Sequence, residues 1–132
     1  MRAFVIGNGP SLLDTPVDRL AGEFTIAMNR FDLLGTDWDP TWWVMADVRH
    51  EDGWWDWDRL LPRKSMFVFR EQDRPVIEPY GLRNTLFYEP CVHADDEKGW
   101  HWHLPEPCSR GGSVSIALQT AVNVVTTSAS MP

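Results

Sequence analysis

Five short apolar runs, separated by turns and helix-forming segments, most constrain how this 132-residue chain can fold. The first run is continuous rather than alternating, which indicates a strand that is buried on both faces. Strands that alternate with short helices favour a parallel sheet with right-handed crossovers. We therefore predict one α/β domain with a mostly parallel sheet, whose strands lie at residues 3–6, 23–28, 41–46, 65–69 and 85–88.

The segments between the apolar runs carry helix signals of different strength. Thr15 and Pro16 predict the start of a short helix that reaches about Ala21, where Gly22 ends it. We expect a short helix or turn at 32–39, a helix at 50–61 with Trp54, Trp57 and Leu61 on its apolar side, and a loop or broken helix at 70–82. An apolar helix is expected at 114–125, so that the domain covers residues 1–125 and residues 126–132 form a frayed tail.

A glycine turn, Gly7-Asn8-Gly9-Pro10-Ser11, follows the first predicted strand directly. Gly7 and Gly9 can adopt positive φ and leave room for a ligand near the backbone, and Ser11 with Asp14 has the spacing of a helix-capping box. Open α/β sheets bind ligands, and phosphates in particular, where a strand ends in such a turn. A tight turn without a ligand is the alternative interpretation, because a lone glycine pair is a weak pattern.

Polar residues also follow the second and third predicted strands. Asn29 and Arg30 end the second, and Asp47 ends the third. In a parallel sheet these strand ends lie together with Asn8, and Gly111-Gly112-Ser113 would add another helix start. Each residue has a structural alternative: the asparagines as turn formers, Arg30 as a salt-bridge partner, and Asp47 as a cap rather than a ligand of Mg²⁺ or ribose.

Composition restricts the kinds of partner. The formal net charge is −7, which argues against nucleic acid as a partner. The sequence has neither a run of 18 apolar residues nor the pattern of a signal peptide, and its two cysteines, Cys91 and Cys108, suit a reducing compartment. We therefore expect a soluble, cytoplasmic protein.

Residues 91–109 form a long segment without clear periodicity. His93, His101 and His103 lie there, but their spacing matches no ordinary zinc site, so we predict that the protein holds no metal of its own. Trp100 and Trp102 are suited either to stack on a base or sugar or to anchor the loop.

The glycine turn, Asn29-Arg30-Phe31, Asp47 and Gly111-Gly112-Ser113-Val114, taken in this order, resemble the bacterial sialyltransferase-like superfamily. Two of its branches are similar: sialyltransferases that use CMP-sialic acid, and the MptE-like proteins named for 6-hydroxymethylpterin diphosphokinase. The resemblance covers about residues 1–122 and implies a Rossmann-like fold with a nucleotide or nucleotide-sugar donor and a small acceptor. It implies that Asn8 and Gly9 contact the nucleotide, that Asn29 reaches a phosphate or ribose, and that Gly112 and Ser113 close the donor pocket.

The resemblance supports two functional hypotheses. The first is a transferase, either glycosyltransferase-like or diphosphokinase-like, with no tightly bound cofactor and with Mg²⁺ arriving together with the donor. The second is a catalytically inactive module that binds nucleotides or a partner, because the family's next strand, its Gly-x-Asp motif and its catalytic histidine region are not found after Val122. For this reason no catalytic residue is assigned.

A parallel sheet that lacks one strand of the family pattern would expose a hydrophobic edge. Such an edge favours addition of a strand from a second chain. The sequence therefore predicts a homodimer, or aggregation, through an open sheet edge.

Overall fold

A computed structural model describes residues 1–45, 57–88, 117–118 and 121 of the chain. These residues form a five-stranded sheet in which every neighbouring pair of strands is parallel. The strands are β1 (Phe4–Val5), β2 (Thr25–Met28), β3 (Trp42–Met45), β4 (Met66–Arg70) and β5 (Thr85–Tyr88). The predicted α/β class and parallel sheet are confirmed, and each strand lies within one residue of its predicted limits or inside them.

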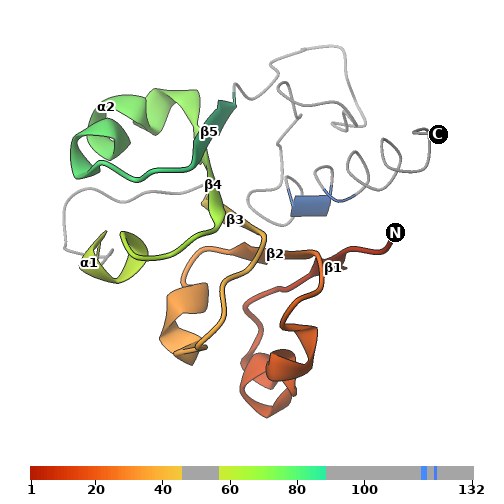
Figure 1. The fold of residues 1–132 in the computed structure, drawn as a ribbon. Helices are drawn as coiled ribbons and strands as arrows, with labels where there is room; N and C mark the ends of the chain where they lie inside the picture. Colours follow the sequence, from red (N-terminus) through yellow and green to blue (C-terminus); the bar gives the residue numbers. More distant parts are fainter. Residues whose placement is uncertain (46–56, 89–116, 119–120, 122–132) are drawn as a thin grey trace.

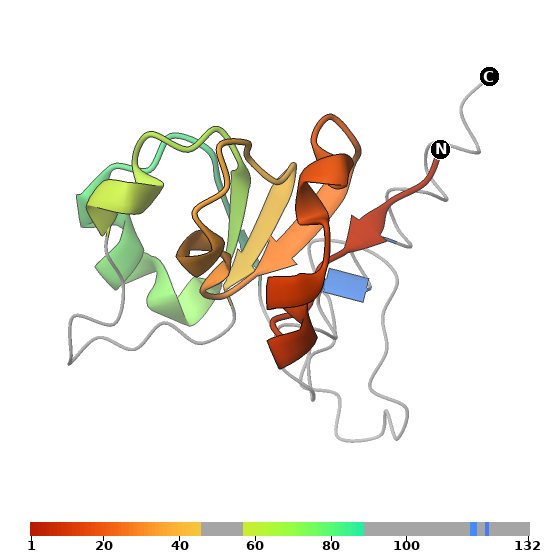
Figure 2. The same cartoon turned by 90° about the horizontal axis from the view of Figure 1, so that it is seen from below.

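The strands lie in sequence order across the sheet, from β1 at one end to β5 at the other (Figure 1). Short helical turns connect them: η1 (Pro10–Asp14) and η2 (Val17–Leu20) before β2, η3 (Phe31–Leu34) before β3, and α1 (Trp57–Leu60) before β4. The predicted broken helix between β4 and β5 is observed as η4 (Glu71–Asp73), α2 (Arg74–Ile77) and η5 (Glu78–Tyr80). Figure 2 gives a second view, turned by 90°, of these turns beside the sheet.

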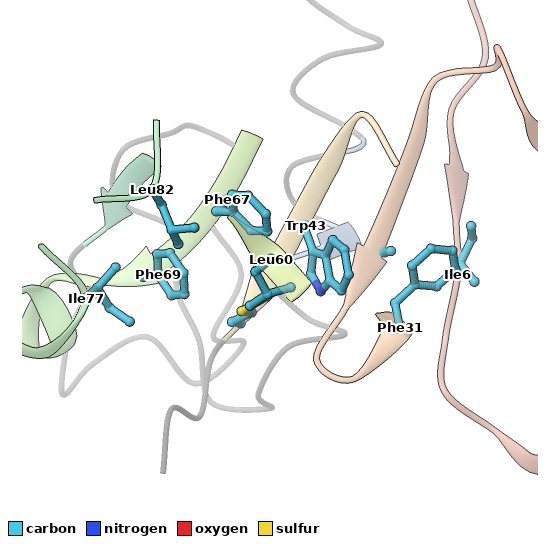
Figure 3. Close-up of a cluster of buried hydrophobic side chains, with 10 residues drawn as sticks. Ile6, Phe31, Trp43, Leu60, Phe67, Phe69, Ile77 and Leu82 are labelled. Carbon is cyan, nitrogen blue, oxygen red and sulfur yellow. The ribbon is translucent and has the colours of Figure 1, made fainter. Parts of the chain in front are cut away.

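The connecting turns that the structure describes pack on the same face of the sheet. Residues from η1, η2, η3, α1 and α2 belong to one apolar cluster with Ile6, Trp43, Phe67 and Phe69 of the sheet (Figure 3). The opposite face carries Ile26, Val44, Val68 and Tyr88, and Ala117 and Ala121 of the final predicted helix pack there. This two-sided cover explains why the strands consist of continuous apolar runs.

The two tryptophans of β3 point to opposite faces, as the alternation of side chains along a strand requires. Trp43 is fully buried in the cluster beneath the helical turns, whereas Trp42 packs against the opposite cluster. The rings of Phe31 and Phe67 lie 5.5 and 5.6 Å from the Trp43 ring, so aromatic contacts join η3 and β4 through this residue. Trp43 is thus the central side chain of the larger core.

Several details of the predicted turns differ in the structure. Ser11 does not cap a helix: η1 begins at Pro10 after Gly9, without a side-chain cap, and the carbonyl of Ser11 accepts a hydrogen bond from the Thr15 hydroxyl. The helix that was expected to start at Thr15 is observed as the short turn η2, which begins at Val17. Gly22 does end this turn, with φ of +84°.

The helix predicted at 50–61 is described only from Trp57 onward. There Leu60 is fully buried, whereas Leu61 is 39% exposed, so the assignment of Leu61 to the apolar face is wrong. Leu60 lies in the core, beside Trp43 in Figure 3. Of the final predicted helix, only residues 117–118 and 121 are described, and they are helical.

Side-chain hydrogen bonds tie together the segments at the amino ends of the strands. The Asp39 carboxylate accepts bonds from the Arg63 guanidinium at 3.0 Å and from the Lys64 amide at 3.1 Å. The Ser65 hydroxyl donates to the Pro40 carbonyl, and the backbone amides of Thr25 and Thr41 each donate to the other's hydroxyl. The loops that lead into β2, β3 and β4 are therefore fixed to one another.

We predict that Trp43→Ala lowers the free energy of unfolding by about 3–5 kcal/mol, because it leaves a cavity in the larger core. Trp42→Ala is the matched control on the same strand, and it should cost less because Trp42 is only partly buried. Urea denaturation of both variants measures the difference. A loss for Trp42→Ala as large as that for Trp43→Ala would show that the core is not centred on Trp43.

Candidate functional site

The loop Gly7–Ser11 leaves the carboxyl end of β1 and is exposed along its whole length. The amide of Leu12 donates to the Gly9 carbonyl, which closes the first turn of η1. This is the predicted order of strand, glycine loop and helical turn. The loop is therefore placed where a parallel sheet offers its strand ends to a ligand.

The glycines of this loop do not use the conformations that only glycine adopts readily. Gly9 has φ of −67° and ψ of 159°, and the glycines with positive φ in the described part are Gly22, Gly35 and Gly81. Gly7 and Gly9, which could adopt positive φ, therefore do not do so in the structure. A Cβ added at Gly7 would meet nothing within 4 Å, and one at Gly9 would meet only the Ser11 hydroxyl at 3.9 Å. The glycines leave open space over the loop instead.

Asn8 and Asn29 lie at neighbouring strand ends, as predicted, and a hydrogen bond joins their segments. The Asn8 side-chain amide donates to the Met28 carbonyl at 2.9 Å, so the glycine loop is tied to the end of β2. Asn29 follows directly in the left-handed conformation with φ of 48°. The backbone amide of Asn29 donates to the Val44 carbonyl at 2.9 Å, and the Trp43 indole N–H donates to the backbone carbonyl of Asn29 at 2.7 Å.

Arg30 is paired with a carboxylate that the sequence did not mark as part of the site. Its guanidinium donates two hydrogen bonds to Asp32, at 2.9 and 3.0 Å, and the Asp32 side chain is 4% exposed. Arg59 of α1 approaches the same carboxylate at 3.8 Å while its own side chain remains 57% exposed. Arg30 therefore makes a salt bridge of the kind that its structural alternative predicts, and its place in the binding site stays a prediction.

Sequence reasoning missed Asp32 and Arg59, and the sequence offers little signal for either. Asp32 follows Asn29 by three residues and looks like an ordinary acid in a turn, and Arg59 lies on the polar side of a predicted helix. Their association depends on α1 and η3 sharing one apolar cluster, which no local pattern encodes.

The remaining predicted site residues fall outside the described part of the chain. These are Asp47, Gly111, Gly112 and Ser113, together with the histidines and tryptophans of residues 91–109. Within the described part, no group of three or more His, Cys, Asp or Glu side chains is arranged to hold a metal ion. There is also no described helix that is long and apolar enough to cross a membrane.

The structure also has a surface hollow of about 460 Å³. Residues from η1 to the start of η2, the end of η3 and the segment after it line the hollow, and none of the predicted site residues is among them. Two carboxylates, Asp18 and Asp37, belong to its lining, and Asp18 accepts a hydrogen bond from the Trp38 indole at 2.8 Å. Because carboxylates repel phosphate, this hollow is a poorer candidate for an anionic ligand than the Gly7–Ser11 loop.

Tyr88 ends β5 with a fully buried side chain, and its hydroxyl is the buried side-chain polar atom without a hydrogen-bond partner in the described part. Burial raises the pKa of this hydroxyl well above its ordinary value of 10.0, while the nearby Arg70 lowers the pKa and Asp73 raises it. Arg70 and Asp73 form an ion pair at 3.2 Å. The folded protein therefore strongly favours the neutral phenol.

Comparisons with known proteins yield no relative: no family model, no curated protein and no solved structure matches the chain.

We predict that Asn29→Gly leaves the free energy of unfolding nearly unchanged, because glycine adopts the left-handed conformation without strain. Asn29→Val should lower it by about 1–3 kcal/mol, because a β-branched residue is strained at this φ. Urea denaturation of both variants measures the two effects. Equal losses for glycine and valine would show that the side chain of Asn29, rather than its backbone conformation, stabilises this turn.

Stability should also fall as the pH rises above about 10, the ordinary pKa of a tyrosine hydroxyl. The unfolded chain releases the Tyr88 proton in this range whereas the folded chain retains it, so the unfolded state binds fewer protons and gains stability with pH. Urea denaturation between about pH 8.5 and 11, a range that brackets the ordinary pKa of tyrosine, measures how the free energy of unfolding changes with pH. Tyr88→Phe should flatten it, and an unchanged slope in that variant would contradict the assignment.

Proposed function

We propose that this protein binds a nucleotide or nucleotide-sugar at the carboxyl ends of β1 and β2 and transfers a group from that donor to a small acceptor. The observation that carries the proposal is the exposed Gly7–Ser11 loop, which the Asn8 side chain ties to the end of β2 beside Asn29. Open backbone near two glycines and amide side chains from two adjacent strands suit the phosphate and ribose of a nucleotide.

The two ends of the strands differ in a way that supports this placement. At the amino ends, the loops before β3 and β4 are bound to one another through Asp39, Arg63 and Ser65. At the carboxyl ends, the glycine loop is exposed, and no backbone group crowds the space above Gly7. A ligand is therefore better accommodated at the carboxyl ends of the strands.

In the reaction class proposed, the protein orients the donor and stabilises the charge that develops on the leaving phosphate. Such positioning and electrostatic stabilisation supply most of the rate in this kind of transfer. The Rossmann-like character of the fold and the assignment to the sialyltransferase-like or MptE-like group rest on the sequence resemblance. The roles of Asp47 with Mg²⁺ and of Gly111–Ser113 at the far side of the donor remain part of this proposal.

Gly9→Val tests the proposal directly. The backbone at Gly9 is extended and a Cβ fits there, so the variant should fold with an unchanged melting temperature. The added methyl groups would occupy the open space over the loop and reduce nucleotide affinity at least about tenfold, by the steric loss of the closest contact. Calorimetry with a panel of nucleoside mono- and diphosphates measures the affinity.

Ala21→Val is the matched control, because Ala21 is exposed, its backbone has φ of −56° and ψ of 128°, and it precedes β2 at the amino ends of the strands. It should bind like the wild type. The proposal fails if no nucleotide binds the wild-type chain at millimolar concentration, or if Gly9→Val binds as tightly as Ala21→Val.

A further inference from the structure

Two hydrogen bonds from β3 hold the turn that ends β2. The backbone amide of Asn29 donates to the Val44 carbonyl at 2.9 Å, and the backbone carbonyl of Asn29 accepts a bond from the Trp43 indole at 2.7 Å. These two groups belong to the peptide units on either side of the Asn29 Cα. Because the orientations of the two peptide units determine φ and ψ, the two bonds together hold Asn29 in its left-handed conformation, with φ of 48°.

The left-handed conformation is uncommon for a residue other than glycine, although asparagine adopts it more readily than most. Such a conformation persists where the surrounding structure determines it. At Asn29 the bond to Val44 fixes the peptide unit before the Cα, and the bond from Trp43 fixes the peptide unit after it. The direction in which the Asn29 side chain leaves the turn therefore depends on both bonds.

The same turn also holds the glycine loop. The Met28 carbonyl and the Asn29 amide N–H are the two polar groups of one peptide unit, and they point in opposite directions. The N–H faces Val44 in β3, whereas the carbonyl accepts the Asn8 side-chain amide at 2.9 Å. Hydrogen bonds therefore run from β3 through the turn to the Gly7–Ser11 loop of the candidate site.

The core holds the Trp43 indole in place. Trp43 is fully buried, and its ring packs against Phe31 and Phe67, with ring centroids 5.5 and 5.6 Å away (Figure 3). A buried N–H is costly to leave without a partner, so the indole favours the one turn conformation that presents the Asn29 carbonyl to it. The packing of the core is thus transmitted to the turn at the end of β2.

We propose that Trp43 is a positioning residue for the candidate site: its indole N–H sets the turn at Asn29 and, through the Met28 carbonyl, the glycine loop. This inference rests on the proposed function for the nature of the ligand, a nucleotide. It adds a residue of β3 that neither the strand-end pattern nor the resemblance assigned. Because Trp43 is fully buried, it acts through Asn29 and Asn8 rather than by contact with the ligand.

Trp43→Phe tests the inference, with Phe69→Leu as the matched control. Phenylalanine keeps an aromatic ring at position 43 but has no N–H to donate. Phe69 of β4 is also fully buried in the larger core, where its ring faces Phe67 and Phe87. Both variants shrink a buried aromatic side chain of the same cluster, so both should lower the melting temperature.

NMR of the ligand-free protein gives the first readout. The three-bond coupling between the amide proton and Hα of Asn29 reports φ of this residue. Trp43→Phe should change the coupling, because the peptide unit after Asn29 loses its bond to the indole, whereas Phe69→Leu should leave the coupling as in the wild type. An unchanged coupling in Trp43→Phe, or an equal change in both variants, would overturn the inference.

Nucleotide affinity, measured by calorimetry with nucleoside diphosphates, gives the second readout. Trp43→Phe should weaken binding about tenfold, the loss expected when one hydrogen bond to the ligand is misplaced, and Phe69→Leu should bind like the wild type. In a chain that already carries Asn29→Gly, Trp43→Phe should weaken binding no further, because the side chain that it positions is gone. Losses that simply add in the double variant, or equal losses in Trp43→Phe and Phe69→Leu, would contradict a positioning role.

The two readouts separate this inference from the proposed function. If the coupling of Asn29 depends on Trp43 but no nucleotide binds the wild type at millimolar concentration, the indole sets the turn and the proposed function fails. If nucleotides bind the wild type and Trp43→Phe equally well, the proposed function stands and Trp43 is not a positioning residue.

Discussion

The rest of the described structure depends on the packing and the hydrogen bond of the buried Trp43 indole. Its ring packs against Phe31 and Phe67, and so it holds η3 and β4 in the same core. Its N–H donates to the Asn29 carbonyl at 2.7 Å, which fixes the left-handed turn at the end of β2. One side chain therefore stabilises the larger core and shapes the proposed binding edge. A fully buried tryptophan is well suited to this, because its apolar surface packs while its N–H needs a hydrogen-bond partner.

A second constraint is the buried charge of Asp32. A carboxylate that is 4% exposed is costly unless it is paired, and Arg30 provides two hydrogen bonds to it. This requirement explains why Arg30, at the end of β2, is held in an ion pair. It also explains how a second arginine, Arg59, comes to lie near the strand end. The charge arrangement and the core packing act together here, because Phe31 and Leu60 anchor the two elements that carry the ions.

The fold class could be predicted from the sequence because continuous apolar runs and turn residues are local signals. All five described strands, the glycine end of η2 and the opposite faces of Trp42 and Trp43 follow from such signals. The details that failed depend on geometry that a pattern does not specify. Ser11 has the spacing of a capping residue, yet the turn begins one residue earlier, at Pro10. Gly9 could adopt positive φ, yet its backbone is extended.

The candidate site was predictable only in part, for a related reason. Asn8 and Asn29 follow strands directly, so the parallel sheet brings them together as expected. The pairing of Arg30 with Asp32 depends on the conformation of the turn after β2, and the approach of Arg59 depends on α1 and η3 sharing one apolar cluster. The order of strands across the sheet is likewise a tertiary property, and the described helical turns between the strands pack on one face as a consequence.

The central claim is that a nucleotide binds at the carboxyl ends of β1 and β2. Backbone amide chemical shifts, measured by NMR on the isotope-labelled protein during titration with a nucleoside diphosphate, test it most directly. The account predicts that the largest changes in chemical shift occur at Gly7, Asn8, Gly9 and Asn29, with little change at Lys64 or Arg83, which lie before the amino ends of β4 and β5. Changes centred on the hollow lined by Asp18 and Asp37, or on the amino ends of the strands, would contradict it.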